Sequence, residues 1–319
     1  MNFAFKYMNS HAIGFIPEQF DPFGLTGRIW HRILGLYDFL IFSSLLLCFE
    51  CVAMAYISCA IQDLPWNPML AVIPFFVAFS VYNLNRKTDE DEDAVNRQDR
   101  FAFTKRYEAP LYYGALLSLG LAFVLSALSG IPSLLATGAP FILGTLYSFR
   151  LLPEGLGYRR LKEIPAVKNI TVGLAWGILL SLLPVFFWHR EPGPGTVITF
   201  LLFFMWGFMA SMIPDIRDRA GDASADVRTI PVIFGEQRTK RILTGVLILL
   251  GIPIVTSSLF LLPRSATMIV VAANIYSHGC VALLEREGLI YIVADFISDG
   301  QYIFFSLAFV IFTSLHLVY

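Results

Sequence analysis

Long apolar stretches recur along the chain, and polar residues gather between them. About 20 residues of α-helix cross a hydrocarbon core of about 30 Å. Stretches of about that length cover nine ranges: 34–60, 68–84, 110–129, 131–149, 166–188, 196–213, 241–262, 266–284 and 300–318. None alternates apolar with polar residues, as a strand of a membrane barrel would. The pattern predicts an all-α membrane protein, a bundle of nine transmembrane helices.

Composition supports the membrane prediction. The mean hydropathy is +0.66, and only 15% of the 319 residues are charged, whereas soluble domains are about a quarter charged. We expect residues 31–319 to form one intramembrane domain and residues 1–30 a cytoplasmic or interfacial arm. No removable signal peptide is expected, because the arm lacks a long apolar core followed by small residues.

The distribution of basic residues predicts the orientation. If the N-terminus is cytoplasmic and nine helices cross, all but two of the 23 Lys and Arg residues lie on the cytoplasmic side, the exceptions being Arg190 and Arg264. Such an excess is typical of cytoplasmic loops. We therefore expect a multi-pass protein, of a plasma (inner) membrane, whose polar chemistry faces the cytoplasm.

Five consecutive acidic residues, 89–93, follow the second apolar stretch. At 100° per residue, Asn85, Asp89 and Asp93 fall within about 80° of one another on a helix. Asp91 points away from that face, and we expect Asp91 and Glu92 to be solvated. A charged block of this length is usually only a solvated loop, and a functional interpretation needs a second group of charges.

That second group follows the sixth apolar stretch. Asp215, Asp218 and Asp222 lie within about 60° of one another in helical phase. Two acidic stripes that each follow an even-numbered span suggest an internal duplication. The first eight spans would then form two similar four-helix units, and a ninth helix would complete the bundle.

Facing carboxylates in a cleft of low dielectric repel one another unless cations are bound. Oxygen ligands without His or Cys favour Mg²⁺ over zinc, and Mg²⁺ commonly shares its coordination with phosphate oxygens. A diphosphate carried on an apolar chain, such as a polyprenyl diphosphate, is the substrate that suits these groups and a bilayer. Basic residues in the same loops are available for the remaining phosphate charge: Arg86, Lys87, Arg150, Lys162, Lys168 and Arg217.

These motifs resemble those of the UbiA superfamily of intramembrane prenyltransferases. Asn85, Asp89 and Asp93 are similar to the first family motif, and DIRDRAGDASADVRTIPVIFG (215–235) is similar to the second. LYSFR (146–150) and LKEIPAVKNITVGLAWG (161–177) look like the central region. For the family's Tyr-x3-Lys motif, Leu151 stands four places after Tyr147, with Arg150 one place early, whereas Tyr158 and Lys162 have the motif's spacing further along. Which basic residue meets the diphosphate therefore stays open.

The resemblance implies Mg²⁺-dependent transfer of a prenyl group from a polyprenyl diphosphate to a lipophilic acceptor. We expect an aromatic acceptor, and a prenylated glycerol lipid, a tetrapyrrole and a carotenoid end stay open as alternatives. The expected catalytic residues are Asn85, Asp89, Asp93, Asp218, Asp222 and Tyr147, and the four Asp among them are the expected metal ligands. Tyr147 is the candidate aromatic ring for stabilising an allyl cation. The expected substrate-binding residues are Arg86, Arg150, Lys162, Lys168, Asn169 and Asp215.

Two other functions remain open. A cyclase of the same superfamily would act on the prenyl diphosphate alone, and a polytopic transporter would also contain buried acidic residues. Transporters hold such charges near the midplane, whereas these stripes follow the spans. The bilayer, the diphosphate and the acceptor are the expected partners, with no nucleic acid and no protein partner. Asp38 and Glu50, which lie within the first span, are candidates for acceptor binding because acidic residues inside spans are rare and usually functional.

Overall fold

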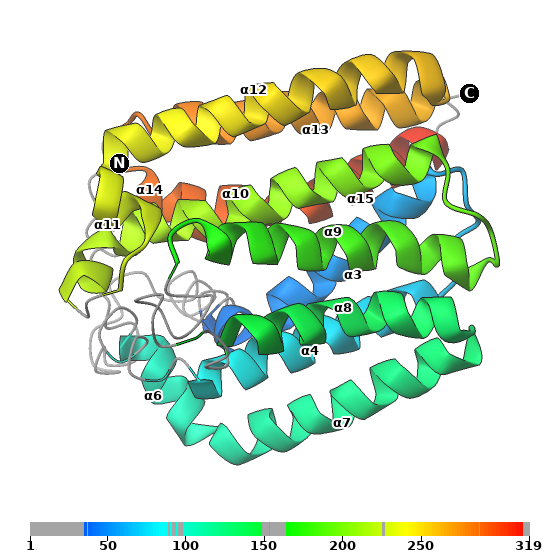
Figure 1. The fold of residues 1–319 in the computed structure, drawn as a ribbon. Coiled ribbons are helices and arrows are strands. Elements are labelled where there is room, and N and C mark those ends of the chain that lie inside the picture. The colour runs from blue at the N-terminus through cyan, green and yellow to red at the C-terminus, as the bar shows by residue number, and fades with distance from the viewer. Residues whose placement is uncertain are drawn as a thin grey trace, which may run out of the picture.

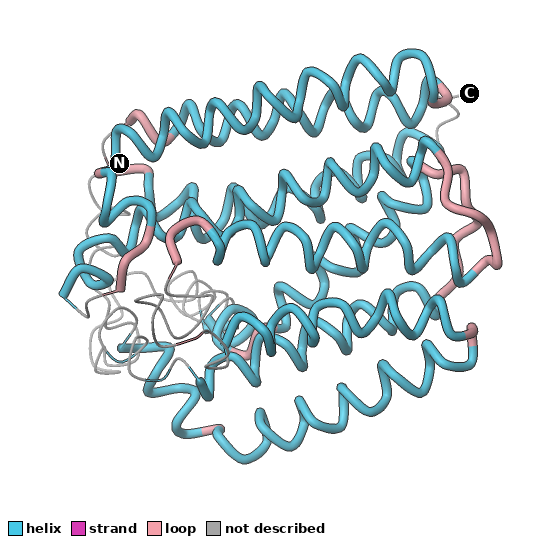
Figure 2. The backbone as a smooth tube through the Cα atoms, in the orientation of Figure 1, coloured by secondary structure: helices cyan, strands magenta, loops and turns pink. Residues whose placement is uncertain are grey.

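The computed structural model describes residues 35–36, 38–88, 90, 94, 98–148, 153, 164–224, 227–286 and 288–314. All regular secondary structure in these ranges is helical (Figures 1 and 2). The all-α prediction is confirmed for these ranges. The helices are α3 (Leu45–Ile61), α4 (Met69–Thr88), α6 (Gln98–Arg106), α7 (Glu108–Leu128), α8 (Ile131–Ser148), α9 (Val167–Phe187), α10 (Pro194–Ser224), α11 (Ile230–Phe234), α12 (Glu236–Leu261), α13 (Arg264–Leu283), α14 (Ile290–Ile292), a π-helical turn (Val293–Ile297) and α15 (Ser298–Ser314).

Six of the helices in these ranges are long and apolar enough to cross a membrane: α4, α7, α9, α10, α12 and α13. Two further apolar helices are shorter, namely α3 and the Ile131–Leu146 part of α8. The structure therefore supports a polytopic membrane protein by helix length and composition. The count of nine transmembrane helices and the division into two four-helix units stay predictions.

The long helices run roughly parallel or antiparallel to one another, and the two ends of the bundle differ (Figure 1). The short helices α6, α11 and α14 lie at one end, which we call the polar end. At the opposite end, short connections join α7 to α8 and α12 to α13, and a longer loop (188–193) joins α9 to α10. Because α4 and α10 both terminate at the polar end, both predicted acidic stretches begin on the same side of the bundle.

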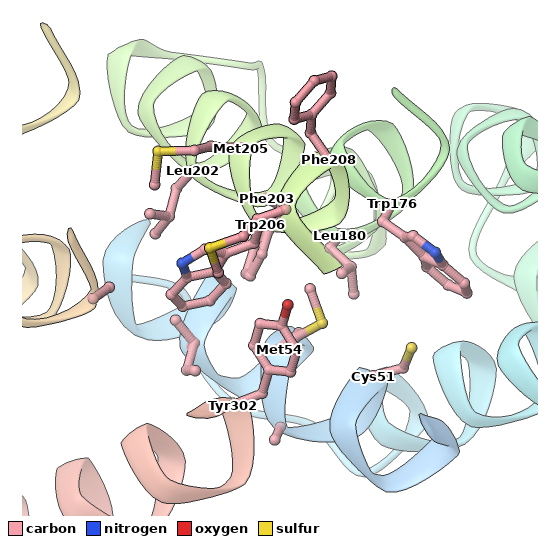
Figure 3. Packing of buried hydrophobic residues seen from close by; sticks show 14 of the residues in the cluster. Cys51, Met54, Trp176, Leu180, Leu202, Phe203, Met205, Trp206, Phe208 and Tyr302 are labelled. Atoms are coloured by element: carbon pink, nitrogen blue, oxygen red, sulfur yellow. The ribbon is translucent and has the colours of Figure 1, made fainter. Parts of the chain in front are cut away.

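Helix α10 is the most buried of the six candidate spans, and 67% of its most apolar window is buried, against 22% for α7. Trp206 of α10 is fully buried, and its indole N–H donates to Ser277 Oγ of α13 at 3.0 Å. Tyr302 of α15 meets the same indole edge-on at 4.9 Å between ring centroids (Figure 3). One side chain thus joins three helices, and its polar N–H is satisfied inside an apolar core.

Helices α9 and α10 approach each other closely because glycines face each other between them. A Cβ atom on Gly173 would lie 2.7 Å from the carbonyl oxygen of Phe204, and one on Gly207 would lie 3.0 Å from the Cα of Gly173. Small residues of this kind allow the backbones of membrane helices to come together, where van der Waals packing then holds them. The contact fixes the register of the antiparallel pair. It therefore also sets which side chains of α9 and α10 face each other one turn nearer the polar end.

We predict that Gly173→Ala destabilises the protein by about 1–3 kcal/mol, the usual cost of forcing extra volume into a packed interface. The obstructing atom is a backbone oxygen, which a side-chain rotation cannot move. Thermal unfolding of the purified protein in detergent measures the effect. Gly245→Ala in α12 is the matched control, because nothing lies within 4 Å of its added Cβ. Equal melting temperatures for the two variants would contradict the proposed close contact.

Candidate functional site

The structure describes the side chains of seven of the predicted site residues: Asn85, Arg86, Lys168, Asn169, Asp215, Asp218 and Asp222. The backbone of Tyr147 lies in the last turn of α8, and its side chain is outside the described part. Four others fall outside the described residues altogether: Asp89, Asp93, Arg150 and Lys162. The site can therefore be built from α9, α10 and the end of α4.

The second acidic stretch occupies the last turns of α10. Its 31 residues make a helix about 46 Å long, which exceeds a hydrocarbon core of about 30 Å. The helix continues through Pro214, and the three aspartates follow this residue. Asp215 and Asp222 are buried, with 4% and 7% of their surface exposed. The predicted helical stripe thus lies on a continuous helix, at the polar end of the bundle.

Asp215 is held by two residues from the first turn of α9. Lys168 Nζ lies 2.7 Å from its Oδ1, and Asn169 Nδ2 donates to its Oδ2 at 3.3 Å. Asn169 Nδ2 also donates to Ser211 Oγ at 2.9 Å, and Ser211 Oγ in turn donates to the carbonyl of Phe208 at 3.0 Å. Asn169 and Ser211 each lie four residues from the Gly173–Gly207 contact, on its polar side. The helix contact therefore positions this network.

Asp218 and Asp222 have different neighbours. Arg217 donates to both carboxylate oxygens of Asp218, from Nε at 2.7 Å and from a terminal nitrogen at 2.6 Å. Thr229 Oγ1 donates to Asp222 Oδ2 at 3.3 Å, and the backbone N–H of Val227 donates to the carbonyl of Asp222 at 2.8 Å. The chain that returns toward α11 is thus anchored on Asp222, while Arg217 neutralises its sequence neighbour.

Arg86 has a structural contact that sequence reasoning missed. It donates to the carbonyl oxygens of Phe42 and, at 3.1 Å, of Ile41. These carbonyls precede Ser43 and Ser44, where a turn separates two helical segments and Ser44 has a φ of 65°. A helix that ends inside an apolar region leaves carbonyls that need donors, and Arg86 supplies them. The consecutive serines inside the first apolar run were the available signal, since Gly and Ser pairs often mark kinks.

Asn85, one residue before Arg86, lies in the last turn of α4 and is half-buried. Glu90, one of the five consecutive acids, forms ion pairs with Lys105 at 2.6 Å and Lys87 at 3.1 Å. The hydrogen bond from Lys105 holds the pKa of the Glu90 carboxyl below its ordinary value, and Lys87 adds to this effect. Glu90 is therefore ionised at neutral pH and links the end of α4 to α6.

No group of three or more His, Cys, Asp or Glu side chains that could hold a metal ion occurs among the described residues. Of the four expected metal ligands, Asp218 and Asp222 are described, and they come from one stretch only. Their chemistry nevertheless fits the expected ion, because Mg²⁺ prefers oxygen ligands and binds through few carboxylates.

The class of protein to which this helical bundle belongs follows from a comparison of the sequence with models of known protein families. The model of the UbiA prenyltransferase family matches residues 41–287. The chain therefore belongs to the UbiA prenyltransferase family, and the resemblance seen in the motifs is confirmed. The matched region includes both acidic stretches and every predicted site residue.

Individual relatives are distant. The digeranylgeranylglyceryl phosphate synthase of Natronomonas pharaonis is 24% identical over 186 residues, which are 57% of this chain and 62% of that protein. The chain thus aligns with somewhat less than two thirds of the length of this curated relative.

Solved structures of UbiA homologues share the fold. One from Archaeoglobus fulgidus, bound to GPP and Mg²⁺, superposes with a TM-score of 0.61 at 17% identity, over 86% of this chain and 98% of that one. An apo homologue from Aeropyrum pernix K1 gives a TM-score of 0.62 at 14% identity, over 82% and 98% of the two chains. At these identities the likeness shows a common fold.

The contact between Lys168 and Asp215 can be tested by a double-mutant cycle. Lys168→Met and Asp215→Asn should each lower the stability, and together they should cost about 1 kcal/mol less than the sum, because either change alone already breaks the pair. Chemical or thermal unfolding in detergent measures the cycle. Arg241→Met, combined with Asp215→Asn, is the control, since the structure records no contact between these two residues. Additive effects for Lys168 and Asp215 would contradict the ion pair.

Proposed function

We propose that this protein transfers a prenyl group from a polyprenyl diphosphate to a lipophilic, aromatic acceptor within the membrane, in a reaction that requires Mg²⁺. One observation carries the proposal: the helices that lead into the two acidic stretches end on the same side of an apolar bundle, in a chain of the UbiA prenyltransferase family. The Archaeoglobus fulgidus homologues bound to GPP or DMAPP with Mg²⁺ give further support.

In the proposed reaction, the bond between the allylic carbon and the diphosphate oxygen breaks, and its electron pair leaves with the diphosphate. An electron pair of the acceptor then forms the new bond to that carbon, and a base takes the proton that the acceptor loses. Bound Mg²⁺ would supply positive charge to the leaving diphosphate. The chain's part is to place the ions, hold the diphosphate and exclude water from the allylic carbon.

We assign the metal to Asp89, Asp93, Asp218 and Asp222, with Asn85 as a further polar ligand of the site. Asp222 is buried and fixed by Thr229, so its carboxylate is held in place before any ion binds. Asp218 is half-buried and faces Arg217, which would balance part of the charge of this carboxylate. The pairing keeps a buried acidic stretch stable until a divalent ion arrives.

The diphosphate would meet basic residues on the same side. Lys168, whose side chain is 39% exposed, is the best placed of these in the described part, because it pairs with Asp215 at the polar end. Arg150 and Lys162 are assigned the same role from the sequence. Arg86 would act mainly by holding the bend of the first span, next to Asn85. Tyr147 remains the proposed aromatic group beside the allylic carbon.

A cyclase of the same superfamily would use the same diphosphate and metal without an acceptor. Purified protein with Mg²⁺, labelled prenyl diphosphates of several lengths and a panel of acceptors, analysed by mass spectrometry, separates the two activities. Products that contain the acceptor support transfer. Cyclic hydrocarbons or alcohols formed equally with and without acceptors would show that the protein is a cyclase and not a transferase. If no prenyl diphosphate is turned over, both proposed activities are overturned.

Removal of the metal or of one of its ligands should abolish most of the activity. We expect no turnover in excess EDTA and recovery with Mg²⁺. Asp222→Asn should lower the rate at least about a hundredfold, as loss of one preorganised charged contact commonly does. Asp91→Asn is the matched control and should stay near the wild-type rate, because helical phase turns this residue away from the stripe. Equal losses in the two variants would refute the assignment.

We also propose that nine spans place the polar end on the cytoplasmic side, where the diphosphate would bind. Ala220, exposed on the last turns of α10, and Glu191, exposed between α9 and α10, mark opposite ends of the bundle. In a background without the four native cysteines, Ala220→Cys should react with a membrane-impermeant thiol reagent only from the cytoplasmic face. Prenyl diphosphate with Mg²⁺ should protect it, whereas Glu191→Cys should react only from outside, without protection. The reverse labelling would show that the orientation is wrong.

A further inference from the structure

Four charged side chains form a closed ring where α4, α6 and α7 meet. Lys87 contacts Glu108 and lies 3.1 Å from Glu90, and Lys105 lies 2.6 Å from Glu90 and 3.9 Å from Glu108. The ring joins the last turn of α4 to the start of α7 and to the end of α6. It therefore fixes the end of α4, where the first acidic stretch begins.

A groove of about 580 Å³ opens beside this ring. Among the described residues, its walls carry three cationic side chains and one carboxylate, and the other described lining residues are aromatic or small: Lys87, Lys105, Arg106, Glu108, Ala109, Pro110, Tyr112 and Tyr113. The volume falls in the range of sites that hold small molecules. The described lining residues have a net positive charge, which favours an anionic ligand.

Of the three described cations that line the groove, Lys87 and Lys105 belong to the charged ring and Arg106 does not. It is exposed, and its guanidinium lies 5.5 Å from the centre of the Tyr107 ring. None of the carboxylates in the described ranges forms an ion pair with it. Arginine forms paired hydrogen bonds with phosphate more readily than lysine does, so Arg106 is suited to a phosphate group.

The apolar part of the site continues along the outer face of α7. Tyr113 is 67% exposed at the groove, and Leu117, Val124 and Leu128 follow it on the same face, at 64%, 59% and 77% exposed. Tyrosines are typical of the level at which lipid head groups meet the hydrocarbon. Helix α7 lies at the edge of the bundle (Figure 1), packed mainly on α4 and α8. Its exposed stripe therefore faces the lipid.

We propose that this groove binds the phosphate head group of an anionic phospholipid of the surrounding bilayer, while the acyl chains of that lipid lie along the exposed stripe of α7. The positive lining would meet the phosphate, the tyrosines would lie at the level of the interface, and the apolar stripe would meet the acyl chains. These three features follow one another along α6 and α7 in the same order as the parts of such a lipid. The bound lipid would contact α6 through Lys105 and Arg106 and α7 through Tyr112 and Tyr113, and so would bridge the two helices. It would thereby steady the end of α4, where the first acidic stretch begins.

A prenyl diphosphate is the other amphiphile that could occupy the groove. Its diphosphate would bring more negative charge than a phosphodiester, and the described lining offers a single carboxylate, Glu108, for a bridging cation. The helix that lines most of the groove, α7, packs mainly on α4 and α8, whereas the second acidic stretch lies on α10. These features favour the phospholipid.

The test uses the full chain in nanodiscs that contain a photoactivatable phosphatidylglycerol or the matching phosphatidylcholine. Mass spectrometry of the digested protein locates the crosslinks. Phosphatidylglycerol should label residues 98–128, and phosphatidylcholine should label them much less. Arg106→Gln should lower the labelling about fivefold, the usual effect of one basic residue near an anionic surface, and Arg106→Lys should restore part of it. Arg241→Gln, an exposed arginine at the polar end of α12, is the matched control and should label like the wild type.

Equal labelling by the two lipids, or an equal loss in the Arg106 and Arg241 variants, would overturn the proposal. Displacement of phosphatidylglycerol by an equal concentration of geranylgeranyl diphosphate would also overturn it and would assign the groove to the prenyl donor. The measurement needs no enzymatic turnover, so its result does not depend on the proposed prenyl transfer.

Discussion

The close contact between α9 and α10 is the constraint on which the described part of the site depends. A hydrocarbon core offers apolar side chains little gain from burial against each other, so membrane helices associate through van der Waals packing and internal hydrogen bonds. The glycines at 173 and 207 let the two backbones meet. One turn further, the same register brings Asn169 to Ser211 and to Asp215. A bulkier interface would separate these polar atoms and leave a carboxylate buried without its hydrogen bonds.

The second constraint is the charge at the polar end. A buried carboxylate is tolerated where other groups balance it, and each described aspartate of the second stretch has a different neighbour: Lys168 for Asp215, Arg217 for Asp218 and Thr229 for Asp222. These contacts allow α10 to carry three acidic residues immediately after an apolar span. They also set the charge balance that a divalent ion and a diphosphate would alter under the proposed function.

Charge also organises the periphery. The ring of Lys87, Glu90, Lys105 and Glu108 ties the end of α4 to α6 and α7. Arg86, on the same turn of α4, donates to carbonyls of the interrupted first span. The last turn of α4 is thus attached on two sides, one toward the first span and one toward α7. Since this turn also carries Asn85, the attachments determine where the first acidic stretch begins.

The sequence by itself determined the class of the protein, because membrane helices must bury every backbone polar group within a segment and therefore appear as long apolar runs. It also determined the family and the position of Asp215, Asp218 and Asp222 on one helix, since helical phase follows from spacing alone. Only the tertiary structure decided which partner each charge has. Lys168 meets Asp215 from 47 residues away, and Arg86 serves the carbonyls of Ile41 and Phe42. Such pairings depend on the register between helices, which the packing of facing surfaces sets and which no spacing within one helix encodes.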